Sequence, residues 1–122
     1  MKQIYFNDWA SLSWENLKGK EALQKDFEFT LTDEKIIFAS YTYECYSGNA
    51  YVLFKQDGKL YEVFGSHCSC YGLEDQWKPE ELNFDYIPER IKLIDEDYNF
   101  NDFTREQKRL LKFRLKKLLI KI

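Results

Sequence analysis

The sequence predicts one α+β domain, in which an N-terminal helix and a C-terminal amphipathic helix accompany an antiparallel meander of three to four strands. Three observations support this class. The chain has 122 residues, the length of one domain. Runs of β-branched and aromatic residues around a hairpin turn occupy its middle, and a helix-capping pattern precedes a leucine-rich end. Without a linker or repeat, we expect residues 1–122 to form a single domain.

Residues 8–24 are predicted to form the first helix. Asp8 can cap it, and Gly19 is a weak point within it. The apolar residues near helical spacing are Trp9, Leu12, Leu17 and Leu23. Residues 27–31 then alternate between apolar and polar types, which predicts a strand, and residues 32–35 predict a turn.

Residues 36–46 read as a long strand, and a hairpin follows it. Asp57-Gly58 is a strong hairpin signal, because both central residues of a type I′ turn need positive φ. The predicted register pairs Phe54 with Tyr61 and Val52 with Val63 on one face, and Tyr51 with Phe64 and Leu53 with Glu62 on the other.

The preceding turn is predicted at Gly48-Asn49, which would set Tyr43 opposite Phe54 and Cys45 opposite Val52. The expected core face is then Tyr43, Cys45, Val52, Phe54, Tyr61 and Val63. A one-residue slip at Ser47 would reverse the faces of the first strand, so both registers stay open.

Two short helical starts are expected after the meander, at residues 79–81 and 88–90, each opened by a proline. Residues 104–107 form a capping box that opens a helix running to the C-terminus. Its apolar face is Leu111, Leu115, Leu118, Leu119 and Ile122. We expect this face to pack on the Phe54/Tyr61 side of the sheet.

Composition favours a cytoplasmic protein. No apolar run approaches the roughly 18 residues of a membrane span. Residues 1–8 lack the apolar core of a signal peptide. Three cysteines, an odd number, fit a reducing compartment better than a disulfide framework.

The segment of residues 65–81 includes Ser66-His67-Cys68-Ser69-Cys70-Tyr71-Gly72-Leu73-Glu74, followed by Gln76-Trp77 and Pro79-Glu80-Glu81. With the hairpin before it, about residues 40–81, it resembles small proteins of phages and bacterial mobile elements. The resemblance implies no activity and no functional residue. It implies the context of a small accessory protein, among which inhibitors and adaptors such as anti-CRISPR proteins act by binding.

His67, Cys68, Cys70 and Cys45 are possible zinc ligands. Their spacing is poor, because one Cys-x-Cys and a distant cysteine replace the usual pair of knuckles, and a structural turn is the better interpretation. A cysteine nucleophile with His67 as its base is also disfavoured. Neighbours on a strand point to opposite faces, and acidic surroundings raise a thiol pKa.

Asp95, Asp97, Asn99 and Glu106 match ligand positions of a calcium loop. Phe100 stands where the loop needs glycine, so a solvated acidic loop is favoured. Paired carboxylates for glycoside hydrolysis cannot be singled out among so many acids. Phosphate-cradling glycine loops are missing from the sequence, which disfavours nucleotide enzymes. We therefore expect no enzyme, no metal and no cofactor.

Charge is segregated along the chain. Residues 74–102 hold ten acids and three bases, and residues 105–122 hold eight bases and one acid, although the net charge is only −3. The terminal helix carries a basic stripe at helical spacing, with two apolar residues beside it. These candidate binding residues are Arg105, Arg109, Lys112, Phe113, Lys116 and Ile120.

Three interpretations of the stripe remain open: it docks on an acidic protein surface, it binds the phosphates of RNA or DNA, or it pairs with the chain's own acidic segment. A pI near 5.3 counts against nucleic acid. We expect a non-enzymatic binding protein, an inhibitor or adaptor of phage type, with an anti-CRISPR-like anti-defence role as the favoured example. Its expected partner is a protein, such as a nucleic-acid-handling host complex. RNA binding is the first alternative, and a zinc-binding or cysteine-dependent enzyme is the second.

Overall fold

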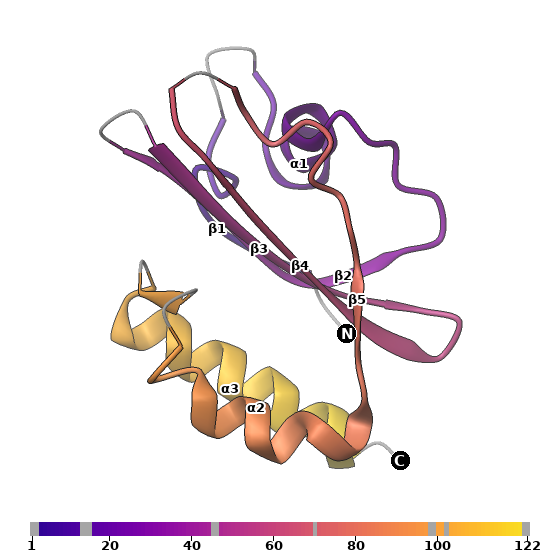
Figure 1. The fold of residues 1–122 in the computed structure, drawn as a ribbon. Helices are drawn as coiled ribbons and strands as arrows, with labels where there is room; N and C mark the ends of the chain where they lie inside the picture. The colour runs from indigo at the N-terminus through magenta and orange to yellow at the C-terminus, as the bar shows by residue number, and fades with distance from the viewer. Residues whose placement is uncertain are drawn as a thin grey trace.

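One five-stranded sheet separates two helical layers in the computed structural model, which describes residues 3–12, 16–44, 47–69, 71–97, 100–101 and 103–120 (Figure 1). In chain order the elements are β1 (Ile4–Asn7), α1 (Gly19–Phe27), β2 (Lys35–Glu44), β3 (Ser47–Gln56), β4 (Lys59–His67), β5 (Glu80–Leu82), the 3₁₀ turn η1 (Phe84–Tyr86), α2 (Ile87–Leu93) and α3 (Arg105–Ile120). The strand order is β1-β2-β3-β4-β5, with β1 parallel to β2 and the other pairs antiparallel. The α+β class is confirmed.

The β3–β4 hairpin forms as its sequence predicts. Asp57 and Gly58 have φ of 53° and 78°, and Gln56 pairs with Lys59 across the two-residue loop. All four predicted cross-strand pairs are present, from Tyr51 with Phe64 to Phe54 with Tyr61. Turn chemistry alone fixed this register, because the loop length leaves only one pairing.

The predicted β2–β3 register is wrong. Tyr43 pairs with Gly48 and Glu44 with Ser47, so Gly48-Asn49 lies within β3. Ile36 and Phe38 oppose the adjacent residues Phe54 and Leu53, which leaves Ile37 as a bulge. The two strands pair as far as Glu44 and Ser47, before the predicted turn, and this earlier connection shifts the register of the whole ladder, whereas the bulge changes only the pairing at the start of β2. Tyr43, expected in the core, is 46% exposed. Cys45 lies outside the described residues.

The N-terminal prediction is also corrected. Residues 4–7 form strand β1, and the helix expected over 8–24 is α1, which begins only at Gly19 and continues to Phe27. Asp8 accepts a hydrogen bond from the backbone N–H of Tyr43 (2.9 Å) instead of capping a helix. Trp9 is buried against α1 from a loop, with its indole N–H donating to Asp26 (2.8 Å). Tertiary contacts thus replace the helix that spacing suggested.

The strand predicted at 27–31 and the helix predicted at 79–81 are both absent. Phe27 ends α1, and Glu28 caps it in the left-handed conformation with φ of 52°. Residues 80–82 instead form β5, paired with β4 from Leu60 to Glu62. The short helix predicted at Pro88 is confirmed as α2, with proline in its first turn.

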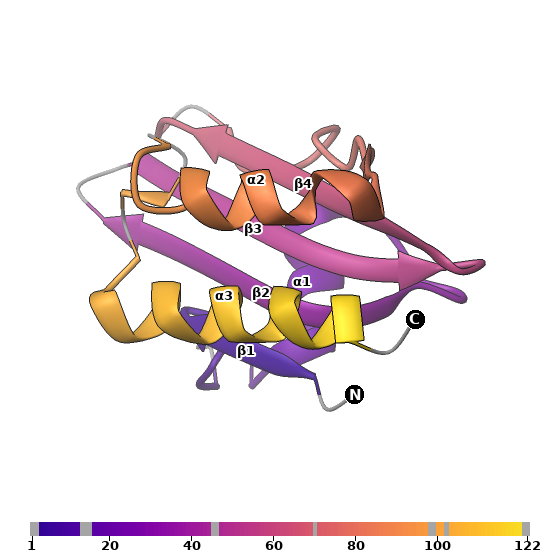
Figure 2. The same ribbon diagram turned by 90° about the horizontal axis from the view of Figure 1, so that it is seen from below.

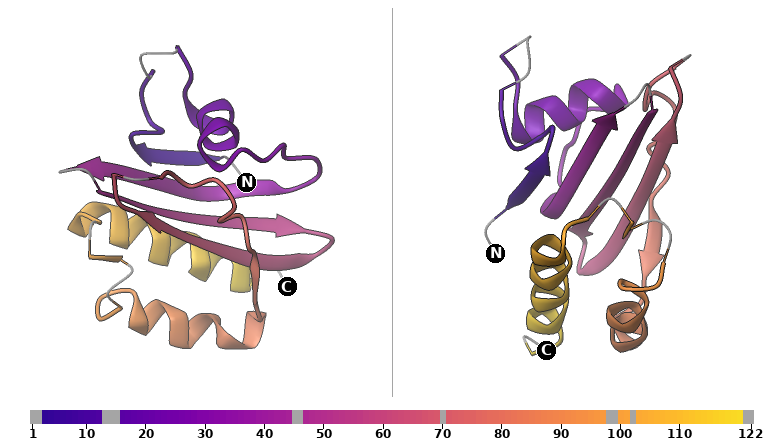
Figure 3. Two further views of the ribbon diagram at one scale, coloured as in Figure 1. Left: turned by 45° about the horizontal axis from the view of Figure 1, so that its top comes forward. Right: turned by 90° about the vertical axis from the view of Figure 1, so that its left-hand side faces the viewer.

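Both faces of the central strands are covered, as the two rotated views show (Figures 2 and 3). α1 covers the face that presents Val52, Phe54 and Val63. α2 and α3 cover the opposite face, where Tyr51 and Leu53 lie. The terminal helix therefore packs on the side opposite to the predicted Phe54/Tyr61 side. Alternating strands that are apolar on both faces do not specify which helix takes which face.

Candidate functional site

The terminal helix α3 begins at the predicted capping box. The Thr104 hydroxyl accepts from the backbone N–H of Gln107, and the Gln107 side-chain oxygen accepts from the backbone N–H of Thr104, each at 3.1 Å. These two bonds satisfy donors that a helix start otherwise leaves without partners. The Gln107 amide also donates to the Asn7 side chain (3.2 Å), which ties the start of α3 to the end of β1.

Leucines fix which face of α3 meets the sheet. Leu111 and Leu115 are fully buried and Leu118 nearly so, whereas Leu119 is partly buried. Burying one leucine stabilises a fold by about 1.5–3 kcal/mol, so these side chains hold α3 firmly in one rotation. Ile122, predicted to share this face, lies outside the described residues. Figure 2, seen from below, shows α3 on the outer side of the sheet, and the basic residues Arg105, Arg109 and Lys116 of this helix are exposed.

The structure brings the predicted basic residues onto one surface. Arg105, Arg109 and Lys116 are exposed, and Lys112 is half-buried. Ile120 lies in the last turn of α3, and its side chain is outside the described residues. Phe113 is 52% exposed. The Lys117 ammonium lies 5.1 Å from the centroid of the Phe113 ring, a cation–π contact.

A groove of about 380 Å³ runs along the first half of α3, lined by Asp95, Arg105, Lys108, Arg109 and Lys112. Lys108 was not among the predicted binding residues. Its position, three residues after Arg105 and four before Lys112, places it on the same helix face and could have identified it. We call the outward face formed by Arg105, Lys108, Arg109, Lys112, Phe113 and Lys116 the basic face.

Internal pairing neutralises only part of the basic face. Lys112 forms an ion pair with Asp95, and the hydrogen bond from Lys112 lowers the pKa of that carboxyl group. Arg109 pairs with Glu106 one turn earlier in the same helix, and this hydrogen bond raises the pKa of the guanidinium. Within the described residues, Arg105, Lys108 and Lys116 form no ion pair with an acid.

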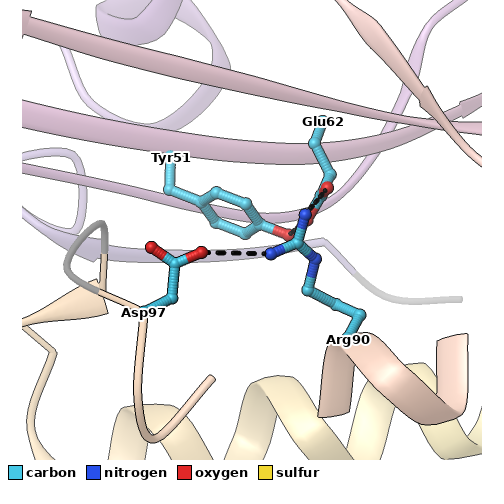
Figure 4. A network of polar contacts seen from close by, with 4 residues as sticks. All are labelled: Tyr51, Glu62, Arg90 and Asp97. Atoms are coloured by element: carbon cyan, nitrogen blue, oxygen red, sulfur yellow. Dashed lines mark hydrogen bonds and ion pairs between the residues drawn. The ribbon is translucent and has the colours of Figure 1, made fainter. Parts of the chain in front are cut away.

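Part of the acidic segment is engaged elsewhere, in a polar network between the sheet and α2 (Figure 4). The Arg90 guanidinium donates to Glu62 (2.9 Å) and to Asp97 (3.3 Å). The Tyr51 hydroxyl donates to the other oxygen of Glu62 (2.7 Å). Glu62 is only 4% exposed, and sequence reasoning missed this network because its members come from four separate segments.

The network connects α2 to strands β3 and β4, because Arg90 bonds Glu62 and Glu62 bonds Tyr51. Burial raises the pKa of Glu62, and the Arg90 charge and the Tyr51 hydrogen bond oppose that rise. Burial also raises the pKa of Tyr51 well above its ordinary value, so its hydroxyl keeps the proton that it donates. The Arg90 guanidinium lies 5.9 to 6.0 Å from the ring centroids of Phe64, Tyr86 and Phe100.

Both ring nitrogens of His67 form hydrogen bonds to groups other than a thiol. Its Nδ1 lies 2.8 Å from the carbonyl oxygen of Cys68, which can only accept, so Nδ1 carries the proton. Nε2 therefore accepts from the Tyr41 hydroxyl (2.6 Å). Both ring nitrogens are occupied by structural hydrogen bonds. The Cys68 residue is exposed, and Cys45 and Cys70, the other proposed zinc ligands, lie outside the described residues.

The described residues of the possible calcium loop form ion pairs with three different basic residues. Asp95 pairs with Lys112, Asp97 with Arg90 and Glu106 with Arg109, and Asn99 lies outside the described residues. Over the described part of the chain, no three His, Cys, Asp or Glu side chains gather closely enough to hold a metal ion.

Comparison with protein-family models, with curated proteins and with solved structures finds no match for this chain. No helix over the described residues has both the length and the apolar character that crossing a membrane requires.

Proposed function

We propose that this protein is a non-enzymatic binding protein, an inhibitor or adaptor, that docks on an acidic protein surface through the basic face of α3. The observation that carries the proposal is the incomplete neutralisation of this face. Asp95 pairs with Lys112 and Glu106 with Arg109, while Arg105, Lys108 and Lys116 point outward with no ion pair to a described residue. Among the described residues, the acids therefore offset only part of the positive charge of this helix face.

Phe113 supplies the apolar part of the surface. Half of its surface is exposed although the helix has buried leucines on its other side, so the fold does not need this ring in its core. Aromatic anchors surrounded by charges are typical of interface hot spots. The phage-type context implied by residues 66–81 fits a small protein that acts by binding, with an anti-CRISPR-like role as one example.

The test is affinity capture from a lysate of the native host, with and without nuclease. We would compare the unaltered protein with Arg105→Glu/Lys116→Glu. The matched control, Lys18→Glu/Lys20→Glu, makes the same change in net charge at exposed positions at the start of α1, on the opposite face of the sheet. Both pairs should leave folding intact, because exposed charges contribute little to stability.

The proposal expects one protein partner that survives nuclease, binds the control variant and is lost from the α3 variant. A captured RNA, or a partner that nuclease releases, would replace the proposal with nucleic-acid binding through the same face. Equal capture by both variants would show that the basic face makes no contact with the partner and would overturn the proposal.

A further inference from the structure

Two exposed tyrosines flank a buried histidine at the end of the sheet where β2 and β4 finish. Tyr43 is 46% and Tyr71 54% exposed, whereas His67 between them is only 6% exposed. The His67 ring centroid lies 5.4 Å from that of Tyr43 and 6.4 Å from that of Tyr71. The two tyrosine rings thus form a surface patch above His67, drawn from two segments that are distant in sequence.

The histidine beneath this patch is rigidly held. It is bonded on one side to the Cys68 carbonyl and on the other to the Tyr41 hydroxyl. Gly48 makes room for it, since a Cβ atom there would lie 2.4 Å from Nε2 of His67. Two hydrogen bonds therefore orient the imidazole ring, and both tyrosine rings contact it.

The loop that carries Tyr71 is also braced. The Gln76 side chain accepts from the backbone N–H of Ser66 (2.8 Å) and donates to the carbonyl of Gly72 (3.0 Å). The Glu74 carboxylate accepts from the backbone N–H of Gly72 (3.0 Å), and Leu73 is buried. A ring that is fixed in place and still exposed loses little conformational entropy when a partner covers it.

The segments that carry the patch contain acids and no bases. Residues 7–16, 36–54 and 60–77 contain no lysine or arginine, and their acids include Asp8, Glu44 and Glu74. Lys35, Lys55 and Lys59 lie at the opposite ends of β2, β3 and β4. Burial raises the pKa of Tyr41, beneath the patch, and the charges of Asp26, Asp8 and Glu74 add to that rise.

We propose that Tyr43 and Tyr71, together with Asp8 and Glu74, form a docking surface for an arginine-bearing segment of a partner protein. A guanidinium stacks on a tyrosine ring and pairs with a carboxylate at the same time, which fits rings bordered by acids. Tyr41 belongs to the core under α1, and α3 packs on the opposite face of the sheet. The surface is thus separate from the basic face, and its ligand has the opposite charge.

The test uses a synthetic nona-arginine peptide and the full chain, with affinity measured by calorimetry at physiological salt. Tyr43→Ala/Tyr71→Ala should weaken binding about tenfold, the combined effect of two cation–π contacts. The matched control, Phe29→Ala/Tyr86→Ala, removes two exposed rings that belong to neither proposed surface, without changing net charge, and should bind like the unaltered protein.

A second pair of variants leaves the rings intact. Asp8→Asn should weaken peptide binding severalfold more than Asp85→Asn, an equal charge change at an exposed position of η1. Chemical-shift changes on adding peptide should centre on residues 41–44 and 66–74. Equal loss in test and control variants, or shifts centred on the acidic residues of α2, would show attraction by net charge alone and would overturn the proposal.

Discussion

Arg90 holds two carboxylates under α2, and its removal is the sharpest test of the packing described above. Its side chain is 14% exposed, against 5% for Glu62 and 25% for Asp97. Arg90→Met keeps most of the side-chain length and removes the charge. Among the described residues, the buried Glu62 carboxylate then keeps only the Tyr51 hydroxyl as a hydrogen-bond partner.

The expected loss follows from that isolated charge. Removing one member of a buried ion pair typically costs 3–5 kcal/mol, and the partial exposure of Arg90 and Asp97 places this case near the lower end, at about 3 kcal/mol. For a domain of this size that corresponds to a fall in Tm of about 10 °C. Urea unfolding and thermal melts at neutral pH would measure both quantities.

The pH dependence has a definite sign. Burial raises the pKa of Glu62 in the folded state, so the folded chain binds the extra proton and stability falls as pH rises through the window between the unfolded and folded pKa values. Without Arg90 the folded pKa rises further and the window widens upward. Arg90→Met should therefore regain more stability than the unaltered protein when pH is lowered from about 8 to about 5.

A second substitution isolates the mechanism. Arg90→Met/Glu62→Gln leaves no buried charge at this position, so it should recover at least about 1 kcal/mol relative to Arg90→Met alone. It should also lose the pH dependence of the single variant. A cost below about 1 kcal/mol for Arg90→Met, or a double variant less stable than the single one, would refute the electrostatic account.

Three further outcomes are expected. Gly48→Ala should cost about 1–3 kcal/mol in urea unfolding, because its Cβ would lie 2.4 Å from Nε2 of His67, and an unchanged midpoint would show that the histidine can move aside. Thr104→Ala should cost about 1 kcal/mol through loss of the helix cap, whereas Thr32→Ala, away from any helix start, should change the melting temperature little. Phe113→Ala should leave the unfolding free energy within about 0.5 kcal/mol of the unaltered protein yet abolish partner capture, and a large stability loss would instead give this ring a structural role.

Local chemistry was readable from the sequence wherever neighbouring residues decide the outcome. Asp57-Gly58 determined the turn and hence every pair of the β3–β4 ladder. Residues 104–107 determined the start of α3, since both capping bonds join residues three apart. The leucine spacing of α3 determined which face of the helix is buried. The basic residues, which lie at other positions around the helix, therefore form the outward face.

Only the tertiary structure decided the remainder, because those outcomes depend on residues far apart in the chain. Pairing with β3 carried the β2 ladder to Glu44 and Ser47, before the Gly48-Asn49 signal, and a bulge at Ile37 shifted the pairing at the start of β2. Trp9 lies in the core from a loop because α1 and β2 enclose it, and residues 80–82 became a strand because β4 offered an open edge. The sequence suggested that the acidic and basic segments pair with each other. In the structure Asp95 pairs with Lys112 of α3, whereas Asp97 pairs with Arg90 of α2. That division of the acids leaves the basic face of α3 only partly neutralised.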